Sequence, residues 1–97
     1  MYQLIFKPKA LEMLEHAYHW YEQKQEGLGD IFLQSVEICY GKLQSAPVAY
    51  GKINNRYRQL IIPRFPYVIA FEIIKNEVIV LAVFHTSRNP KEKLKRK

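Results

Sequence analysis

Residues 56–90 constrain the fold of this chain most strongly, because they hold three runs rich in Ile, Val, Tyr and Phe. Only two short breaks, Pro63-Arg64 and Lys75-Asn76, separate these runs. Breaks of that length leave room only for tight turns, which join strands in an antiparallel arrangement. The stretch therefore predicts a three-stranded antiparallel meander as the centre of the domain.

The middle run of this meander is apolar on both of its faces. One face carries Phe65, Tyr67, Ile69, Phe71 and Ile73, and the other carries Val68, Ala70 and Ile74. Glu72 is the only charged residue within the run. A strand of this kind is covered on both faces, or is covered on one face and bound by a partner on the other.

Two segments before the sheet show helical spacing of apolar residues and predict helices at about residues 9–25 and 31–44. The predicted buried stripe of the first consists of Leu11, Leu14, Tyr18 and Tyr21, widened by Ala10, Met13, Ala17 and Trp20. That of the second consists of Phe32, Val36, Cys39 and Leu43. Gly27-Leu28-Gly29 separates the helices, and Asp30 is expected at or near the second N-terminus, where its carboxylate favours the helix dipole.

The predicted fold class is α+β, in the order β-α-α-β-β-β, with a short strand at residues 2–6. We expect the helical hairpin to pack on one face of the sheet. In that arrangement Leu14, Tyr18, Val36, Cys39 and Leu43 contact residues such as Ile69, Phe71 and Val83. A chain of 97 residues forms one domain, residues 1–97, and its tail at 91–97 is too charged to pack.

Targeting and redox features indicate a cytoplasmic protein. The first ten residues lack the apolar core of a signal peptide, and no run approaches the ~18 apolar residues of a membrane span. The single cysteine, Cys39, cannot form an internal disulfide and falls in a helical apolar stripe, which favours a core role over a nucleophilic one.

Charge is distributed unevenly along the chain, whose formal net charge is +6. Residues 1–45 hold four Lys or Arg against six Asp or Glu, whereas residues 46–97 hold eleven against three. The sheet and the tail are therefore the basic half. This asymmetry predicts an acidic partner, either a nucleic acid or an acidic protein segment.

The basic half supplies the first set of candidate site residues, which are Arg56, Arg58, Arg64, Arg88, Lys91 and Lys93. An arginine cluster beside Tyr57 and Tyr67 could hold a phosphate backbone and stack a base. The alternative is an ordinary basic sheet surface whose arginines pair with Glu72 and Glu77.

His85 is the candidate for acid–base chemistry, because it stands at the end of a predicted strand, where a scaffold presents reactive side chains. Metal-free RNA cleavage needs a base, an acid and cations for the phosphate. His85 with Arg58, Arg64 and Arg88 would fill part of that set. The alternative is a histidine satisfied by hydrogen bonds at a strand end. His16 and His19 are expected to be a solvated pair, and the sequence implies no metal and no cofactor.

Several motifs in this order resemble the RelE/ParE family of type II toxin–antitoxin toxins. They are Leu28-Gly29-Asp30-Ile31-Phe32, Phe65-Pro66-Tyr67, Ala82-Val83-Phe84-His85 and Arg88-Asn89-Pro90. The second and the last look closer to the ParE-like branch. RelE-like members commonly place a catalytic Tyr near the C-terminus, whereas nothing aromatic follows Phe84 here.

The resemblance implies a toxin that arrests growth and that a cognate antitoxin neutralises in a hetero-oligomer. ParE-like members poison DNA gyrase, whereas RelE-like members are ribosome-dependent mRNA endonucleases. The first mechanism is our leading hypothesis, and the second, with His85 and the arginines as its catalytic residues, is the alternative. A third possibility, from a different class, is a non-toxic nucleic-acid-binding module.

Overall fold

The order of elements along the chain is the predicted one. In the computed structural model, which describes residues 1–87, the elements are β1 (Gln3–Phe6), α1 (Pro8–Lys24), α2 (Leu28–Ser45), the 3-10 turn η1 (Pro47–Ala49), β2 (Tyr57–Ile61), β3 (Tyr67–Ile74) and β4 (Glu77–His85). The α+β class is thereby confirmed. The predictions for Arg88, Lys91, Lys93 and the tail at 91–97 lie outside the described residues.

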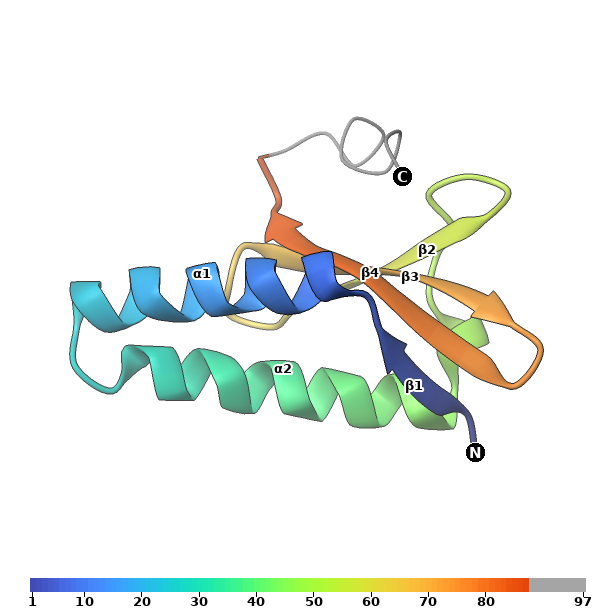
Figure 1. Ribbon diagram of the computed structural model, residues 1–97, viewed down its shortest axis with the longest axis horizontal. Helices are drawn as coiled ribbons and strands as arrows, with labels where there is room; N and C mark the ends of the chain where they lie inside the picture. Colours follow the sequence, from blue (N-terminus) through green and yellow to red (C-terminus); the bar gives the residue numbers. More distant parts are fainter. Residues whose placement is uncertain (88–97) are drawn as a thin grey trace.

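The sheet has the strand order β1-β4-β3-β2. Strands β2, β3 and β4 form the predicted antiparallel meander, and β1 pairs with β4 in parallel, from Gln3 opposite Glu77 to Phe6 opposite Val80. The sheet is therefore mixed. Figure 1 shows the two helices lying side by side, with the sheet beside one end of the hairpin and continuing beyond it.

The turn between the helices is shorter than the sequence suggested, because α2 already begins at Leu28. Gly27 precedes it with a φ of 87°, a left-handed conformation that glycine adopts without steric cost. Asp30 lies in the first turn of α2 but makes no capping hydrogen bond. Instead, the Glu22 carboxylate of α1 accepts hydrogen bonds from the backbone N–H groups of Gly27 and Gly29, both at 2.9 Å. One helix thus caps the other.

The predicted stripe of α2 is confirmed, since Phe32, Val36, Cys39 and Leu43 are all buried. They pack with the helix-facing residues of the sheet, which include Ile69, Phe71 and Val83. This larger core cluster also takes in Phe65, Leu60, Ile62, Val78 and Val80. Burial raises the pKa of the Cys39 thiol, which therefore stays protonated and serves as a packing residue.

The stripe of α1 is partly different from the prediction. Ala10, Ala17 and Tyr21 are buried, and Leu14 is half-buried against the same cluster. Leu11 and Trp20, which were expected in the stripe, are 50% and 51% exposed. We attribute the difference to close packing: the small Ala10 and Ala17 let α1 approach its neighbours, so the core is centred on them and the larger side chains turn outward.

The remaining face of the sheet holds a second, smaller cluster of Tyr57, Val68, Ala70, Ala82 and Phe84. Its β3 members alternate along the strand with those of the larger cluster, which confirms that the middle strand is apolar on both faces.

The last strand contains an irregularity that the sequence did not indicate. Phe71 of β3 pairs with Val80, but its neighbour Ala70 pairs with Ala82, so Leu81 is an extra residue in β4. Such a bulge shifts the alternation of all later side chains by one position. It therefore decides which face of the sheet the end of β4 presents.

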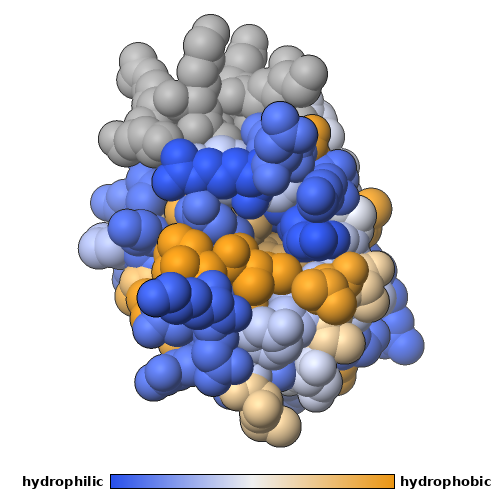
Figure 2. Space-filling model, turned by 90° about the vertical axis from the view of Figure 1, so that its right-hand side faces the viewer, coloured by the Kyte–Doolittle hydropathy of each residue, from blue (hydrophilic) through white to orange (hydrophobic). Residues whose placement is uncertain are grey.

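The surface alternates between apolar and hydrophilic regions. Figure 2 shows the face at the end of the molecule that lies to the right in Figure 1, where a band of apolar side chains runs between hydrophilic ones. None of the described helices combines the length and the apolar character needed to cross a membrane.

Two glycines of α2 are expected to respond to alanine in opposite directions. A Cβ at Gly29 would lie 2.7 Å from Cε1 of Tyr18 and 2.8 Å from Oε1 of Glu22, so Gly29→Ala must displace the groups that join the helices. We expect a loss of roughly 1–3 kcal/mol in the free energy of unfolding. A Cβ at Gly41 meets nothing within 4 Å, so Gly41→Ala should gain roughly 0.5–1 kcal/mol. Urea denaturation of both variants checks this, and an equal gain for both would contradict the close approach at Gly29.

Candidate functional site

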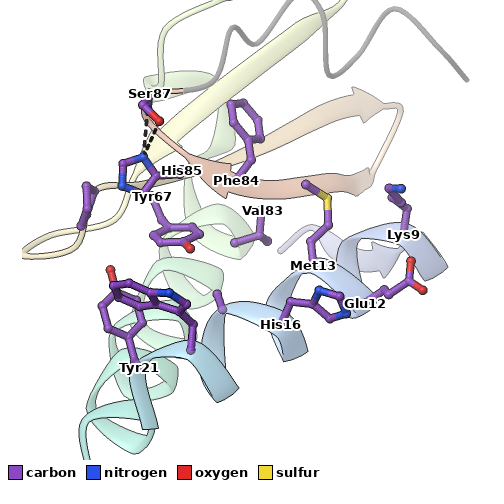
Figure 3. Close-up of a pocket in the computed structure, with 13 residues that line it drawn as sticks. Lys9, Glu12, Met13, His16, Tyr21, Tyr67, Val83, Phe84, His85 and Ser87 are labelled. Carbon is purple, nitrogen blue, oxygen red and sulfur yellow. Dashed lines mark hydrogen bonds between the residues drawn. The ribbon is translucent and has the colours of Figure 1, made fainter. Parts of the chain in front are cut away.

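A cleft of about 770 Å³ opens between α1 and the adjoining ends of β3 and β4. Figure 3 shows Lys9, Glu12, Met13 and His16 following one another along α1, across from Val83, Phe84 and His85 of β4. The complete lining is Lys9, Glu12, Met13, His16, Ala17, Trp20, Tyr21, Pro66, Tyr67, Val83, Phe84, His85 and Ser87. Its volume lies in the range of small-molecule and cofactor sites.

The helical wall of the cleft is a continuous stripe of α1. Its members are Lys9, Glu12, Met13, His16, Ala17, Trp20 and Tyr21, which follow one another at intervals of three, one, three, one, three and one residues. Residues with that spacing lie on one face of a helix. The wall is therefore one helical face, roughly 18 Å long from the rise of twelve residues.

Tyr21 and Tyr67, which line the cleft, belong to an aromatic cluster with Phe32 and Phe65. The ring centroids of Tyr21 lie 5.1 Å from Phe32, 5.0 Å from Phe65 and 5.9 Å from Tyr67. Burial raises the pKa of Tyr21, and Tyr67 raises it further, so its phenol stays neutral. This cluster explains the Phe65-Pro66-Tyr67 motif, because both rings enter the core while Pro66 between them lines the cleft.

His85 reaches the cleft because of the bulge at Leu81, which places it opposite Tyr67 on the α1 side of the sheet. The two rings lie edge to face, with centroids 5.4 Å apart. Nδ1 of His85 accepts a hydrogen bond from the backbone N–H of Ser87 at 3.0 Å and lies 2.9 Å from the Ser87 hydroxyl oxygen (Figure 3). A backbone N–H can only donate, so the neutral ring carries its proton on Nε2.

The charges lining the cleft nearly cancel. Near one end, the negative charge of Glu12 offsets the positive charge of Lys9. Two imidazoles, those of His16 and His85, also line the cleft. His19 points elsewhere and lies 3.8 Å from Glu15. Among residues 1–87, no group of three or more His, Cys, Asp or Glu side chains is arranged to hold a metal ion.

Trp20 is the largest exposed apolar side chain of the cleft. Its indole is half exposed, and the ammonium of Lys24 lies 4.7 Å from its ring centroid. The indole also meets Tyr21 edge to face, at 5.0 Å between centroids. Trp20 therefore contributes a half-exposed aromatic surface to the cleft, in contact with Tyr21 and with the ammonium of Lys24.

Arg56 forms an ion pair with Glu72 of β3. Its Nε donates to Oε2 of Glu72 at 2.7 Å, as the interpretation of a paired basic surface expected, and its guanidinium lies 5.3 Å from the Tyr57 ring centroid. The Asn54 side chain accepts from the backbone N–H groups of Arg56 and Tyr57 and so shapes the loop before β2.

Arg58 also has structural partners. Its Nη1 donates to the carbonyl oxygens of Tyr50 at 2.7 Å and Val48 at 3.2 Å, which fastens the segment after α2 to β2. In register, Arg58 lies opposite Phe71.

Arg58 and His85 are not brought together. Phe71, the partner of Arg58, is four residues along β3 from Tyr67, the partner of His85. Four residues of a strand span roughly 13 Å. The two side chains therefore belong to different parts of the sheet.

Arg64 is at the same end of the sheet as His85. It is exposed, makes no hydrogen bond or ion pair with another described residue, and has a φ of 72° in the turn between β2 and β3. Positive φ is uncommon for a residue with a side chain. Of the predicted site residues, the structure thus gathers Arg64 and His85 at one end, leaves Arg56 and Arg58 elsewhere, and does not describe Arg88, Lys91 or Lys93.

Sequence reasoning missed the helical wall of the cleft. It expected Trp20 in the buried stripe and His16 on the solvated face, whereas both line the same groove together with Met13 and the buried Ala17. One signal was present: the apolar stripe of the first helix is wider than that of the second, which indicates contacts on more than one side.

Comparisons with known proteins bear on the family and on the fold. The sequence matches the ParE toxin of type II toxin–antitoxin systems (parDE) over residues 4–90. Comparison with individually curated proteins gave no significant match. The structure is similar to a chain of the chromosomal ParDE system from P. aeruginosa, with a TM-score of 0.76, 21% identity, and coverage of 88% of this chain and 96% of that chain.

It is also similar to the isolated E. coli RelE toxin, with a TM-score of 0.67, 18% identity, and coverage of 99% of this chain and 98% of that chain. At these identities the two structures demonstrate a common fold, and the sequence match covers most of the chain. The chain therefore belongs to the ParE toxin family of type II toxin–antitoxin systems.

Proposed function

We propose that this toxin arrests growth by binding and inhibiting DNA gyrase, and that a cognate antitoxin neutralises it by direct binding. The observation that carries the choice of mechanism is the hydrogen bonding of His85. Its Nδ1 is occupied by Ser87, and its other nitrogen carries the proton, so the neutral ring has no free lone pair with which to act as a general base.

The distribution of the arginines supports the same proposal. An RNA-cleaving site needs cations around the base to hold the phosphate. Arg58 is committed to two backbone carbonyls in another part of the sheet, and Arg64 is the one described arginine at the end where His85 lies. This leaves the ribosome-dependent endonuclease as the weaker alternative.

Membership of a toxin–antitoxin family implies an antitoxin partner. The net charge of +6 favours an acidic one, because complementary charge accelerates the encounter of two proteins. Among the described arginines, Arg64 is the best placed to contact an acidic antitoxin. Arg56 is already paired with Glu72, and Arg58 donates hydrogen bonds to backbone carbonyls.

Replacing Arg64 by Glu should slow antitoxin association without destabilising the toxin. Rim charges act mainly on the association rate, so we expect a several-fold lower rate at low salt and a smaller difference at high salt. Stopped-flow mixing with the antitoxin at two salt concentrations measures this. Arg58→Gln is the comparison, because its loss should lower the melting temperature instead. An association rate unchanged by Arg64→Glu at low salt would remove Arg64 from the interface.

The decisive experiment for the target adds the purified toxin to gyrase and relaxed plasmid DNA. Inhibited supercoiling that is restored by the antitoxin supports the proposal. Unimpaired supercoiling, together with cleavage of mRNA on programmed ribosomes, would replace gyrase by the ribosome as the target.

A further inference from the structure

His85, the last residue of β4, makes a hydrogen bond that only one of its protonation states allows. Its Nδ1 accepts the backbone N–H of Ser87 at 3.0 Å and lies 2.9 Å from the Ser87 hydroxyl oxygen (Figure 3). Because a backbone N–H can only donate, the first of these bonds requires a free lone pair on Nδ1. The imidazolium form carries a proton on both ring nitrogens and therefore cannot make it.

The Ser87 hydroxyl responds to protonation differently from the Ser87 N–H. A hydroxyl both donates and accepts, so it can turn its hydrogen away and accept a hydrogen bond from a protonated Nδ1. Protonation thus retains the contact between the two side chains but sets two N–H donors against each other at the backbone. The backbone of Ser87 then has to move away from the ring.

The same turn is joined to the neighbouring strand by a backbone hydrogen bond. Thr86 donates its N–H to the carbonyl oxygen of Pro66 at 2.8 Å, and His85 is paired with Tyr67 in the register of β3 and β4. A displacement of Ser87 reaches Thr86 directly, because a rigid peptide unit joins them. The attachment of the end of β4 therefore lies next to an imidazole, the side chain whose charge ordinarily changes between about pH 5 and 8.

The charged and titratable groups around this ring come from three parts of the described chain. On β3, the Tyr67 ring meets it edge to face, at 5.4 Å between centroids. Arg64 lies at the same end of the sheet, in the turn before β3. The ionisable residues of α1 that line the same cleft are Lys9, Glu12, His16 and Tyr21. Among residues 1–87, His85 forms no ion pair, so the direct local consequence of its protonation is the change at Ser87.

We propose that His85 and Ser87 form a proton-operated latch at the end of β4. With a neutral ring the latch holds the turn and the hydrogen bond from Thr86 to Pro66. With a protonated ring the Ser87 N–H loses its acceptor and the turn opens. The latch is therefore closed above the titration range of the ring and opens as the pH falls through it. Because His85 also lines the cleft, acidification adds positive charge there and loosens the strand end that carries it.

A pH titration of ¹⁵N-labelled toxin followed by NMR tests the latch. The Ser87 amide resonance should shift with the same midpoint as the ring protons of His85, because one event moves both. His85→Gln is the matched control, since its side-chain oxygen can accept the Ser87 N–H but does not titrate. The Ser87 amide of that variant should stay constant, and the dispersion of its other amide resonances verifies its fold. The ring signals of His16 and His19 identify shifts that come from elsewhere on the protein.

Amide hydrogen exchange measures the opening itself. After correction for the intrinsic rate at each pH, exchange at Thr86 and Ser87 should rise several-fold on acidification of the unaltered toxin but not of His85→Gln. Ser87→Ala keeps the N–H and lacks the hydroxyl contact, so its rise should be larger. The Lys7 amide, which donates to Val80, is the internal reference and should not respond.

Three results would overturn the proposal. The first is a Ser87 amide that stays constant while the His85 ring titrates. The second is a Ser87 shift of equal size in the unaltered toxin and in His85→Gln, which would assign the response to another group. The third is a His85 ring that stays neutral down to about pH 5, because the latch would then have no proton to operate it.

Discussion

The His85→Gln toxin is expected to arrest growth as strongly as the unaltered protein. Gln keeps an acceptor oxygen that can receive the Ser87 N–H, so the local turn at the end of β4 should survive. What Gln removes is the ability to exchange a proton. If the toxin acts by binding gyrase, that ability contributes nothing to growth arrest.

A nuclease mechanism predicts the opposite result, with a large effect. Loss of a general acid or base typically lowers a rate by about 10²–10⁴-fold, which would abolish toxicity in cells. Purified ribosomes programmed with mRNA distinguish the two mechanisms directly. Site-specific cleavage by the unaltered toxin that disappears with His85→Gln would refute the gyrase proposal. Circular dichroism and antitoxin binding of the variant serve as controls for folding.

The second large effect is expected from Phe32→Ala. Phe32 is fully buried, and its ring centroid lies 5.1 Å from that of Phe65 and 5.3 Å from that of Tyr67. Removing a buried Phe costs about 3–5 kcal/mol, from the lost burial and the cavity left behind. The total free energy of unfolding of a domain of this size is about 5–15 kcal/mol, so the change should remove a large share of it.

Chemical denaturation measures the loss, and Ile38→Ala on the same helix is the matched control because Ile38 is 61% exposed. We expect less than about 0.5 kcal/mol from that change. A Phe32→Ala protein as stable as the control would contradict the central position of the aromatic cluster.

The sequence determined the architecture because its main signals are local. A meander follows from the alternation over residues 65–74 and from the two short breaks at Pro63-Arg64 and Lys75-Asn76. Turns this short allow two consecutive strands to pair only in the antiparallel direction. The stripe of α2 was predicted residue by residue, because a helix that packs on one side has a single apolar face.

Only the tertiary structure decided the composition of the site. α1 contacts both α2 and β4, so part of its wide apolar surface packs in the core and part lines the cleft. The spacing of its apolar residues does not indicate which of them are buried and which line the cleft. The parallel pairing of β1 with β4 joins segments about seventy residues apart, and four residues of strand carry no information about that partner.

The bulge at Leu81 is the clearest case, because one extra residue between Val80 and Ala82 reverses the alternation of everything after it. Read at a strict period of two, the sequence would place His85 on the face opposite Val80. In the structure His85 lies on the same side as Tyr67 and α1, within the cleft. A bulge depends on how two paired strands fit against the core beneath them, and that fit exists only once the whole sheet has formed.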